Sequence, residues 1–118
     1  MPIYYALVAK NNKVILADYT SYEGNFQKYA NQVMERMQPN TKKTFELDEY
    51  FFHYVNEDGV SALCMTDKKM NRKLCFAFLQ DVKKKLAEDY SSRDLEFAKT
   101  NQLSQFQNVI KDKIVSGL

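Results

Sequence analysis

The chain has 118 residues, which fits one compact domain over residues 1–118 and leaves no room for a second. Hydrophobic residues make up 45% and charged residues 27% of it, a globular composition that argues against disorder. The formal net charge of +2 is too small to indicate a nucleic-acid partner. No stretch approaches the roughly 18 apolar residues of a membrane span, so we expect the chain as given to be soluble.

The chain opens with a predicted β-hairpin. Ile3 to Ala9 is apolar on both alternating faces, which is typical of a central strand that is covered on two sides. Asn11-Asn12 predicts a tight turn, and Val14 to Asp18 predicts the returning strand.

A helix is predicted next, between Gly24-Asn25 and Pro39-Asn40. Its apolar residues recur at helical steps and fall on one stripe, so the helix must pack against another element. The stripe consists of Phe26, Tyr29, Ala30, Val33, Met34 and Met37.

Three short strands follow, over Thr44–Leu47, Tyr50–Val55 and Val60–Thr66. They are separated by Asp48-Glu49 and by Asp58-Gly59. The second break is a strong hairpin signal because glycine accepts the positive φ that the turn needs.

Two helices are predicted for the remainder, separated by a break near Ser91-Ser92. The first would start after Thr66-Asp67. The two apolar stripes are Cys75, Phe78, Leu79, Val82, Leu86 and Tyr90, and then Leu103, Phe106, Ile110 and Ile114.

The predicted order is therefore ββαβββαα, an α/β (α+β) fold with a five-stranded, mainly antiparallel sheet. Because the first strand is apolar on both sides, both faces of the sheet must be covered. We expect the first helix on one face and the last two on the other, in a three-layer α-β-α sandwich.

The chemically reactive side chains give little sign of catalysis. Cys64 and Cys75 stand in apolar stretches, which favours buried free thiols over a disulfide scaffold. His53, the only histidine, has no cysteine or carboxylate at a metal-ligand spacing, so a structural role is favoured. With no glycine-rich phosphate loop or nucleophile elbow, we expect no cofactor, no metal and no enzymatic activity.

Several strings, in this order and spacing, resemble the longin domains at the front of long vesicle SNAREs of the vesicle-associated membrane protein type. The similarity covers essentially the whole chain and is greatest to the synaptobrevin-like, tetanus-insensitive kind of endosomal and lysosomal membranes. The strings are residues 1–9 (Met-Pro-Ile-Tyr-Tyr-Ala-Leu-Val-Ala), 24–26 (Gly-Asn-Phe), 50–54 (Tyr-Phe-Phe-His-Tyr), 63–67 (Leu-Cys-Met-Thr-Asp) and 76–79 (Phe-Ala-Phe-Leu) leading into Lys83-Lys84-Lys85.

The resemblance implies a regulatory role in vesicle-mediated transport, in which the domain folds back on the SNARE motif of its own chain and also binds trafficking adaptors. A SNARE motif and a C-terminal membrane anchor are expected after Leu118, and pairing with target-membrane SNAREs would pass through that region. The full-length protein would lie on the cytoplasmic face of endosomal, lysosomal or vacuolar, or transport-vesicle membranes.

The resemblance also places a protein-binding groove between the first helix and the third strand. Apolar side chains there would suit an amphipathic or extended partner. The alternative for the helix residues is that they are simply core. The candidates are Phe26, Tyr29, Val33, Phe45 and Leu47, with Lys43 standing where the family is expected to carry an apolar residue, which favours a partner with acidic residues nearby.

A basic cluster precedes the second helix: Lys68, Lys69, Arg72 and Lys73. Anionic lipid would gain about 1 kcal/mol per basic residue near the membrane surface, enough to orient the domain without anchoring it. The alternative is a solvated helix face.

Two other classes of protein share the predicted architecture. A longin-like subunit of a tethering or coat complex would use the same fold as an assembly element without any SNARE motif. A profilin-like actin-binding module would also place helices around a five-stranded sheet.

Overall fold

The computed structural model describes residues 3–22 and 24–116. Within these ranges, the strands are β1 (Ile3–Lys10), β2 (Val14–Thr20), β3 (Thr41–Leu47), β4 (Tyr50–Glu57) and β5 (Val60–Asp67). The helices are α1 (Phe26–Met34), α2 (Arg72–Asp89), α3 (Ser92–Phe97) and α4 (Gln107–Ser116), with a 3-10 turn, η1 (Ser104–Phe106), before α4. The predicted order ββαβββαα is confirmed for the main elements.

The five strands form one antiparallel sheet in the order β2-β1-β5-β4-β3. β5 is the middle strand, flanked by β1 and β4, and β2 and β3 form the two edges. Asn11 and Asn12 adopt positive φ values of 54° and 58° in the first hairpin turn, as do Asp58 and Gly59 (54° and 77°) in the β4–β5 turn. Both hairpins are where the turn residues predict them.

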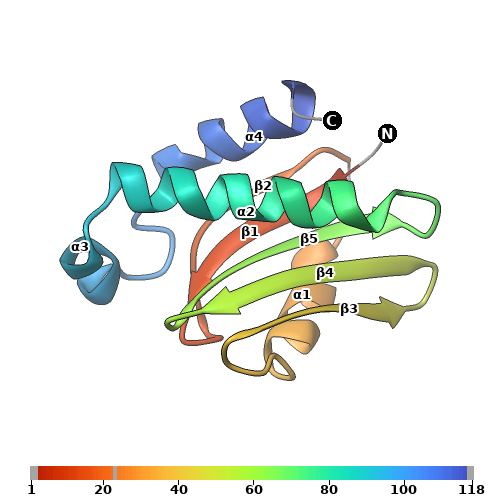
Figure 1. Cartoon of the computed structure of the whole chain (residues 1–118), viewed down its shortest axis with the longest axis horizontal. Coiled ribbons are helices and arrows are strands. Elements are labelled where there is room, and N and C mark those ends of the chain that lie inside the picture. The colour runs from red at the N-terminus through yellow and green to blue at the C-terminus, as the bar shows by residue number, and fades with distance from the viewer. Residues whose placement is uncertain (1–2, 23, 117–118) are drawn as a thin grey trace.

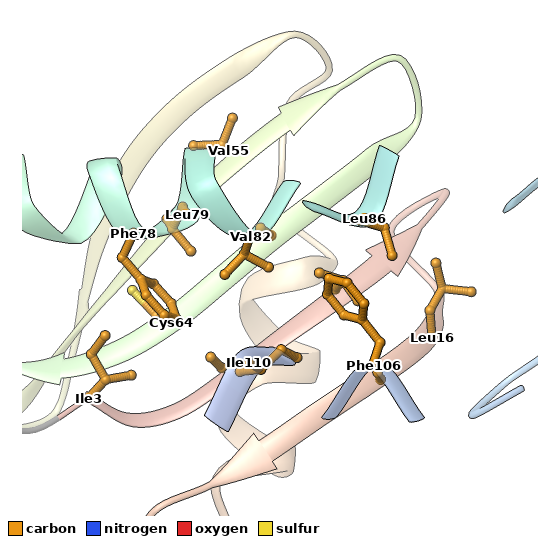
Figure 2. Close-up of a cluster of buried hydrophobic side chains, with 14 of the residues drawn as sticks. Ile3, Leu16, Val55, Cys64, Phe78, Leu79, Val82, Leu86, Phe106 and Ile110 are labelled. Atoms are coloured by element: carbon orange, nitrogen blue, oxygen red, sulfur yellow. The ribbon is translucent and has the colours of Figure 1, made fainter. Parts of the chain in front are cut away.

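Helices cover both faces of the sheet, as predicted (Figure 1). On one face, the buried residues of α1 pack against Tyr5, Leu7 and Ala9 of β1. On the other face, α2, η1 and α4 pack against Ala6 and Val8. Figure 2 shows this second core, in which side chains of α2 meet Phe106 and Ile110 above the sheet. The structure is a three-layer α-β-α sandwich.

In the second core, both ring nitrogens of the buried His53 have hydrogen-bond partners. Its Nδ1 lies 2.8 Å from Thr44 Oγ1 on β3, and its Nε2 lies 3.1 Å from Thr66 Oγ1 on β5. The side chain therefore ties three neighbouring strands together. Cys64 and Cys75 are free and fully buried in the same core, which confirms the interpretation of both as buried thiols.

Two helix ends differ from the predicted ones. α1 ends at Met34 and does not continue to Pro39-Asn40, although Met37 is still buried against the sheet just beyond it. α2 begins at Arg72 and not directly after Asp67. The Asp67 carboxylate accepts hydrogen bonds from the backbone N–H groups of residues 69 and 70, which forms a turn, and the Asn71 side chain then caps the helix.

The short helix α3 lies where the sequence predicts only a break. Ser91 Oγ accepts a hydrogen bond from the Asp94 N–H (3.1 Å), and the Asp94 carboxylate accepts one from the Ser91 N–H (3.1 Å). This capping box starts a new helix at once. No residue of α3 is buried, so α3 has no apolar stripe from which it could be predicted.

The pKa of Tyr29 on α1 depends on the β3–β4 turn. The Asp48 carboxylate raises that pKa, by hydrogen bonding to the hydroxyl and by its negative charge. Asp48 itself has a φ of 56°, a left-handed conformation that asparagine and aspartate tolerate.

The depth of the second core gives a matched pair of stability predictions. Leu79 of α2 is 1% exposed and Leu74 of the same helix is 42% exposed. Leu79→Ala should lower the free energy of unfolding by about 2–5 kcal/mol, because it leaves a cavity. Leu74→Ala should change it by less than about 1 kcal/mol. Urea denaturation measures both, and equal effects would contradict the assignment of the core face.

The contact between Tyr29 and Asp48 gives a titration prediction. Asp48→Asn removes the charge and keeps the left-handed turn, so the pKa of Tyr29 should fall toward its ordinary value. NMR of ¹³C-labelled tyrosine, titrated through alkaline pH, measures that pKa. Asp58→Asn makes the same change in another positive-φ turn and should leave Tyr29 unaffected. An unchanged Tyr29 in Asp48→Asn would mean that the hydrogen bond does not form.

Candidate protein-binding groove

A shallow groove runs between α1 and β3 on one face of the molecule. Its cavity volume is about 30 Å³, close to the space that one water molecule occupies. It is a surface depression, and a partner would lie over it without sinking a large side chain into it. The α1–β3 groove is lined by Gln32, Val33, Arg36, Phe45, Glu46 and Leu47.

The α1 side of the groove is mostly core. Phe26 is 9% exposed and Val33 is 3% exposed, and both pack against the sheet. Tyr29 is half-buried, with its ring centroid 6.4 Å from that of Phe52 on β4. Of the three α1 candidates, Tyr29 therefore has the largest accessible part, but Val33 is the one that lines the groove.

The β3 side of the groove is more open. Phe45 and Leu47 are half-buried, because β3 is an edge strand with no strand beyond it. The Phe45 ring stacks on Tyr54 at 5.8 Å with an interplanar angle of 17°. The exposed Lys43 places its Nζ 5.2 Å from the centroid of the Phe45 ring, a cation–π contact.

Three groove residues were not among the sequence candidates: Gln32, Arg36 and Glu46. Gln32 and Arg36 are one helical turn apart and border the apolar stripe of α1. Their position beside the apolar stripe can be predicted from the sequence. That they form a polar rim of the groove could not be predicted, because it depends on β3 being their neighbour in the fold.

The four residues of the predicted basic cluster lie around the start of α2. Lys68 and Lys69 lie in the turn before α2, and Arg72 and Lys73 lie in its first turn. Lys68 Nζ forms an ion pair with Glu46 (3.2 Å), and the Arg72 guanidinium lies 6.0 Å from the centroid of a β4 aromatic ring. Lys69 and Lys73 are exposed.

The second lysine run, at residues 83–85, does not form a common face. Lys83 is half-buried, and burial lowers its pKa. Lys85 forms an ion pair with Asp89 at 3.1 Å, and Lys84 is exposed. These three side chains therefore have three different environments.

No metal-binding group of three or more His, Cys, Asp or Glu side chains is found among residues 3–22 and 24–116. The helices of this described part are too short or too polar to cross a membrane.

Comparison with known proteins matches residues 16–110 to the Longin family model, described as a regulated-SNARE-like domain. The chain is 38% identical over 94 residues to vesicle-associated membrane protein 7B of Dictyostelium discoideum. The aligned region covers 79% of this chain and 36% of that protein. It is 33% identical over 111 residues to mouse vesicle-associated membrane protein 7, covering 93% and 50%. Vesicle-associated membrane protein 712 of Arabidopsis thaliana is 31% identical over 117 residues, covering 97% and 52%.

The chain thus spans about half or less of the length of these relatives. Among solved structures, the longin domain of the yeast R-SNARE Nyv1p superposes with a TM-score of 0.56 at 16% identity, covering 98% of this chain and 90% of that one. This likeness concerns the fold, and it agrees with the sheet order and layers described above. The family match extends over most of the chain, from β2 to α4, and the chain belongs to the longin family of regulated-SNARE-like domains.

Proposed function

We propose that this domain regulates a vesicle SNARE by binding, in competition, the SNARE motif of its own full-length chain and segments of trafficking adaptors. It acts by binding and not by catalysis. The observation that carries the proposal is the α1–β3 groove, where Phe45 and Leu47 remain half-buried on an edge strand. The names of the similar proteins, all vesicle-associated membrane proteins, support a SNARE over a tethering-complex subunit or a profilin-like module.

The shape of the groove favours an amphipathic segment. The exposed parts of Phe45 and Leu47 offer apolar surface, and Gln32 and Arg36 form a polar rim. A helix or an extended strand that lays its apolar side on such a surface gains affinity from burial and specificity from the rim. Because the depression is shallow, intrinsic affinity should be modest.

Modest affinity is sufficient for an intramolecular switch. A tethered segment has an effective concentration on the order of millimolar. With an intrinsic dissociation constant of roughly 10 µM, about 99% of molecules would be closed. An adaptor that occupies the same groove would then release the SNARE motif.

Lys43 defines a chemical preference of the partner. Its ammonium lies over Phe45 and is exposed, so it is available to a carboxylate beside the apolar anchor. The segment that fits the groove therefore carries an acidic residue next to an apolar one.

The remaining roles belong to the full-length protein. We propose that it acts on endosomal, lysosomal or vacuolar, or transport-vesicle membranes, where its SNARE motif pairs with target-membrane SNAREs. The basic cluster of Lys68, Lys69, Arg72 and Lys73 would contact anionic lipid weakly and orient the domain.

The groove is tested by titrating this domain with the SNARE motif of the full-length protein as a separate polypeptide. Saturable binding is expected, and Phe45→Ala should weaken it about tenfold, since it removes a central apolar contact. Phe97→Ala is the matched control, because Phe97 is 67% exposed on α3. Isothermal titration calorimetry measures both. Absence of binding at several hundred micromolar, roughly, would refute the closed state.

The lipid contact is tested with vesicles of phosphatidylcholine with and without phosphatidylserine. Lys69→Glu and Lys73→Glu should each weaken sedimentation with the anionic vesicles about fivefold or more, because each removes about 1 kcal/mol of attraction and adds repulsion. Lys28→Glu on α1 makes the same charge change on the opposite face and should have little effect. If all three variants behave alike, only net charge matters and the cluster has no specific role.

A further inference from the structure

The sheet has a second uncovered surface, on the face opposite the α1–β3 groove. There α2 packs over β4 and β5, and β3 lies beyond it at the edge (Figure 1). Alternate residues of β3 point to opposite faces, so Lys42 and Thr44 lie on the α2 side, and Lys43 and Phe45 line the other. We call the surface between α2 and β3 the α2-side surface. It comprises Lys42, Thr44, Phe51, Arg72 and Phe76.

Aromatic side chains form the middle of the α2-side surface. Phe51 meets His53 edge to face at 5.9 Å, and His53 meets Phe76 of α2 in the same way at 5.7 Å. His53 is fully buried, while Phe51 and Phe76 are half-buried. An apolar strip thus runs from β4 to α2, and part of each outer ring is accessible.

A cation stands over each of the two accessible rings. Lys42 Nζ lies 5.8 Å from the centroid of Phe76, and Arg72 Cζ lies 6.0 Å from that of Phe51. Neither cation forms an ion pair within the described part of the chain, where Lys68 engages Glu46. Because the rings hold the two cations in place, less side-chain entropy would be lost when they bind an anion.

Cationic side chains are concentrated around this surface. Lys42 lies on β3, Lys68 and Lys69 in the turn before α2, and Arg72 and Lys73 in its first turn. Of the carboxylates among them, Glu46 pairs with Lys68, and Asp67 accepts backbone hydrogen bonds in the turn before α2. Charge complementarity therefore calls for an anionic ligand.

We propose that the α2-side surface binds an extended acidic segment of a partner protein that runs alongside β3. Two of its carboxylates pair with Lys42 and Arg72, and its intervening side chains lie over Phe51 and Phe76. The extended form fits because β3 has no strand on its outer side, so its free backbone groups can pair with the segment. Alternate side chains of that strand project onto this face at intervals of about 7 Å.

A peptide fits this surface better than a membrane does. The free edge of β3 offers backbone hydrogen-bonding groups that an extended peptide can pair with and a bilayer cannot. Lys42 lies on that edge strand, whereas Lys69 and Lys73 lie in the turn before α2 and in its first turn. Lys42 is therefore the residue that separates the two ligands.

The competing explanation is that Lys42 only prevents edge-to-edge association of β3, as charged residues on edge strands commonly do. In that case the sign of the charge is irrelevant to any ligand. Reversing the charge distinguishes the two explanations.

The test uses the ¹⁵N-labelled domain and a synthetic decapeptide in which glutamate alternates with threonine and valine. Its counterpart carries lysine in place of glutamate. We expect saturable amide shift changes in β3, β4 and the first turn of α2 with the acidic peptide, and weaker binding of the basic one. Lys42→Glu and Arg72→Glu should each weaken the acidic peptide about fivefold to tenfold, and the double variant should prefer the basic peptide.

Lys28→Glu, on α1, is the matched control and should leave the affinity unchanged. Thermal unfolding of each variant confirms that the fold is intact. The proposal is overturned if no binding occurs up to roughly 1 mM, if Lys42→Glu binds the acidic peptide as well as the parent does, or if the shifts follow the α1–β3 groove. It is also overturned if Lys42→Glu instead abolishes binding to phosphatidylserine vesicles, because the surface would then be a membrane contact.

Binding of the acidic peptide does not depend on binding of the SNARE motif in the α1–β3 groove. Phe45→Ala should leave binding of the acidic peptide unchanged, because Phe45 lies on the other face of β3. Lys42→Glu should likewise leave binding of the SNARE motif in the α1–β3 groove unchanged. The two proposed binding surfaces can thus be tested, and refuted, independently of each other.

Discussion

The side chains of β1 from Tyr5 to Ala9 are all buried, and successive residues belong to the two separate cores. A strand of this kind is stable only when apolar surface covers both faces, so helices must lie above and below it. The long α2, joined by α4, supplies one cover, and α1 supplies the other. The interior position of β1, between β2 and β5, follows from this requirement.

The same requirement explains why the binding surfaces lie at β3. The helices are placed to cover the central strands, and α1 has only nine residues. The edge strand β3 is left partly uncovered on both sides, which is why five of its seven residues face either solvent or a shallow depression. Apolar surface that the fold does not need for its own core is available there to a partner.

The sequence was sufficient to predict the strands, the hairpins and the two-sided covering of the sheet, because turn residues and apolar periods are local signals. It could not separate core from groove among Phe26, Tyr29 and Val33, since a helical stripe looks the same in either case. The half-burial of Phe45 depends on β3 being an edge strand, and strand order is a property of the tertiary fold. The helix α3 was missed although its capping residues, Ser91 and Asp94, have the spacing typical of a helix start.

The turn between β3 and β4 has a role beyond reversing the chain. Leu47 pairs directly with Tyr50, so only Asp48 and Glu49 intervene, and this short connection sets the register of the whole edge strand. Side chains of a strand alternate with a period of two, so insertion or deletion of a single residue here would transfer Phe45 to the opposite side of the sheet. Lys42 and Lys43 would exchange places at the same time. The length of this loop, more than the composition of the strand, therefore determines which face of the sheet receives the apolar Phe45 and which receives Lys42.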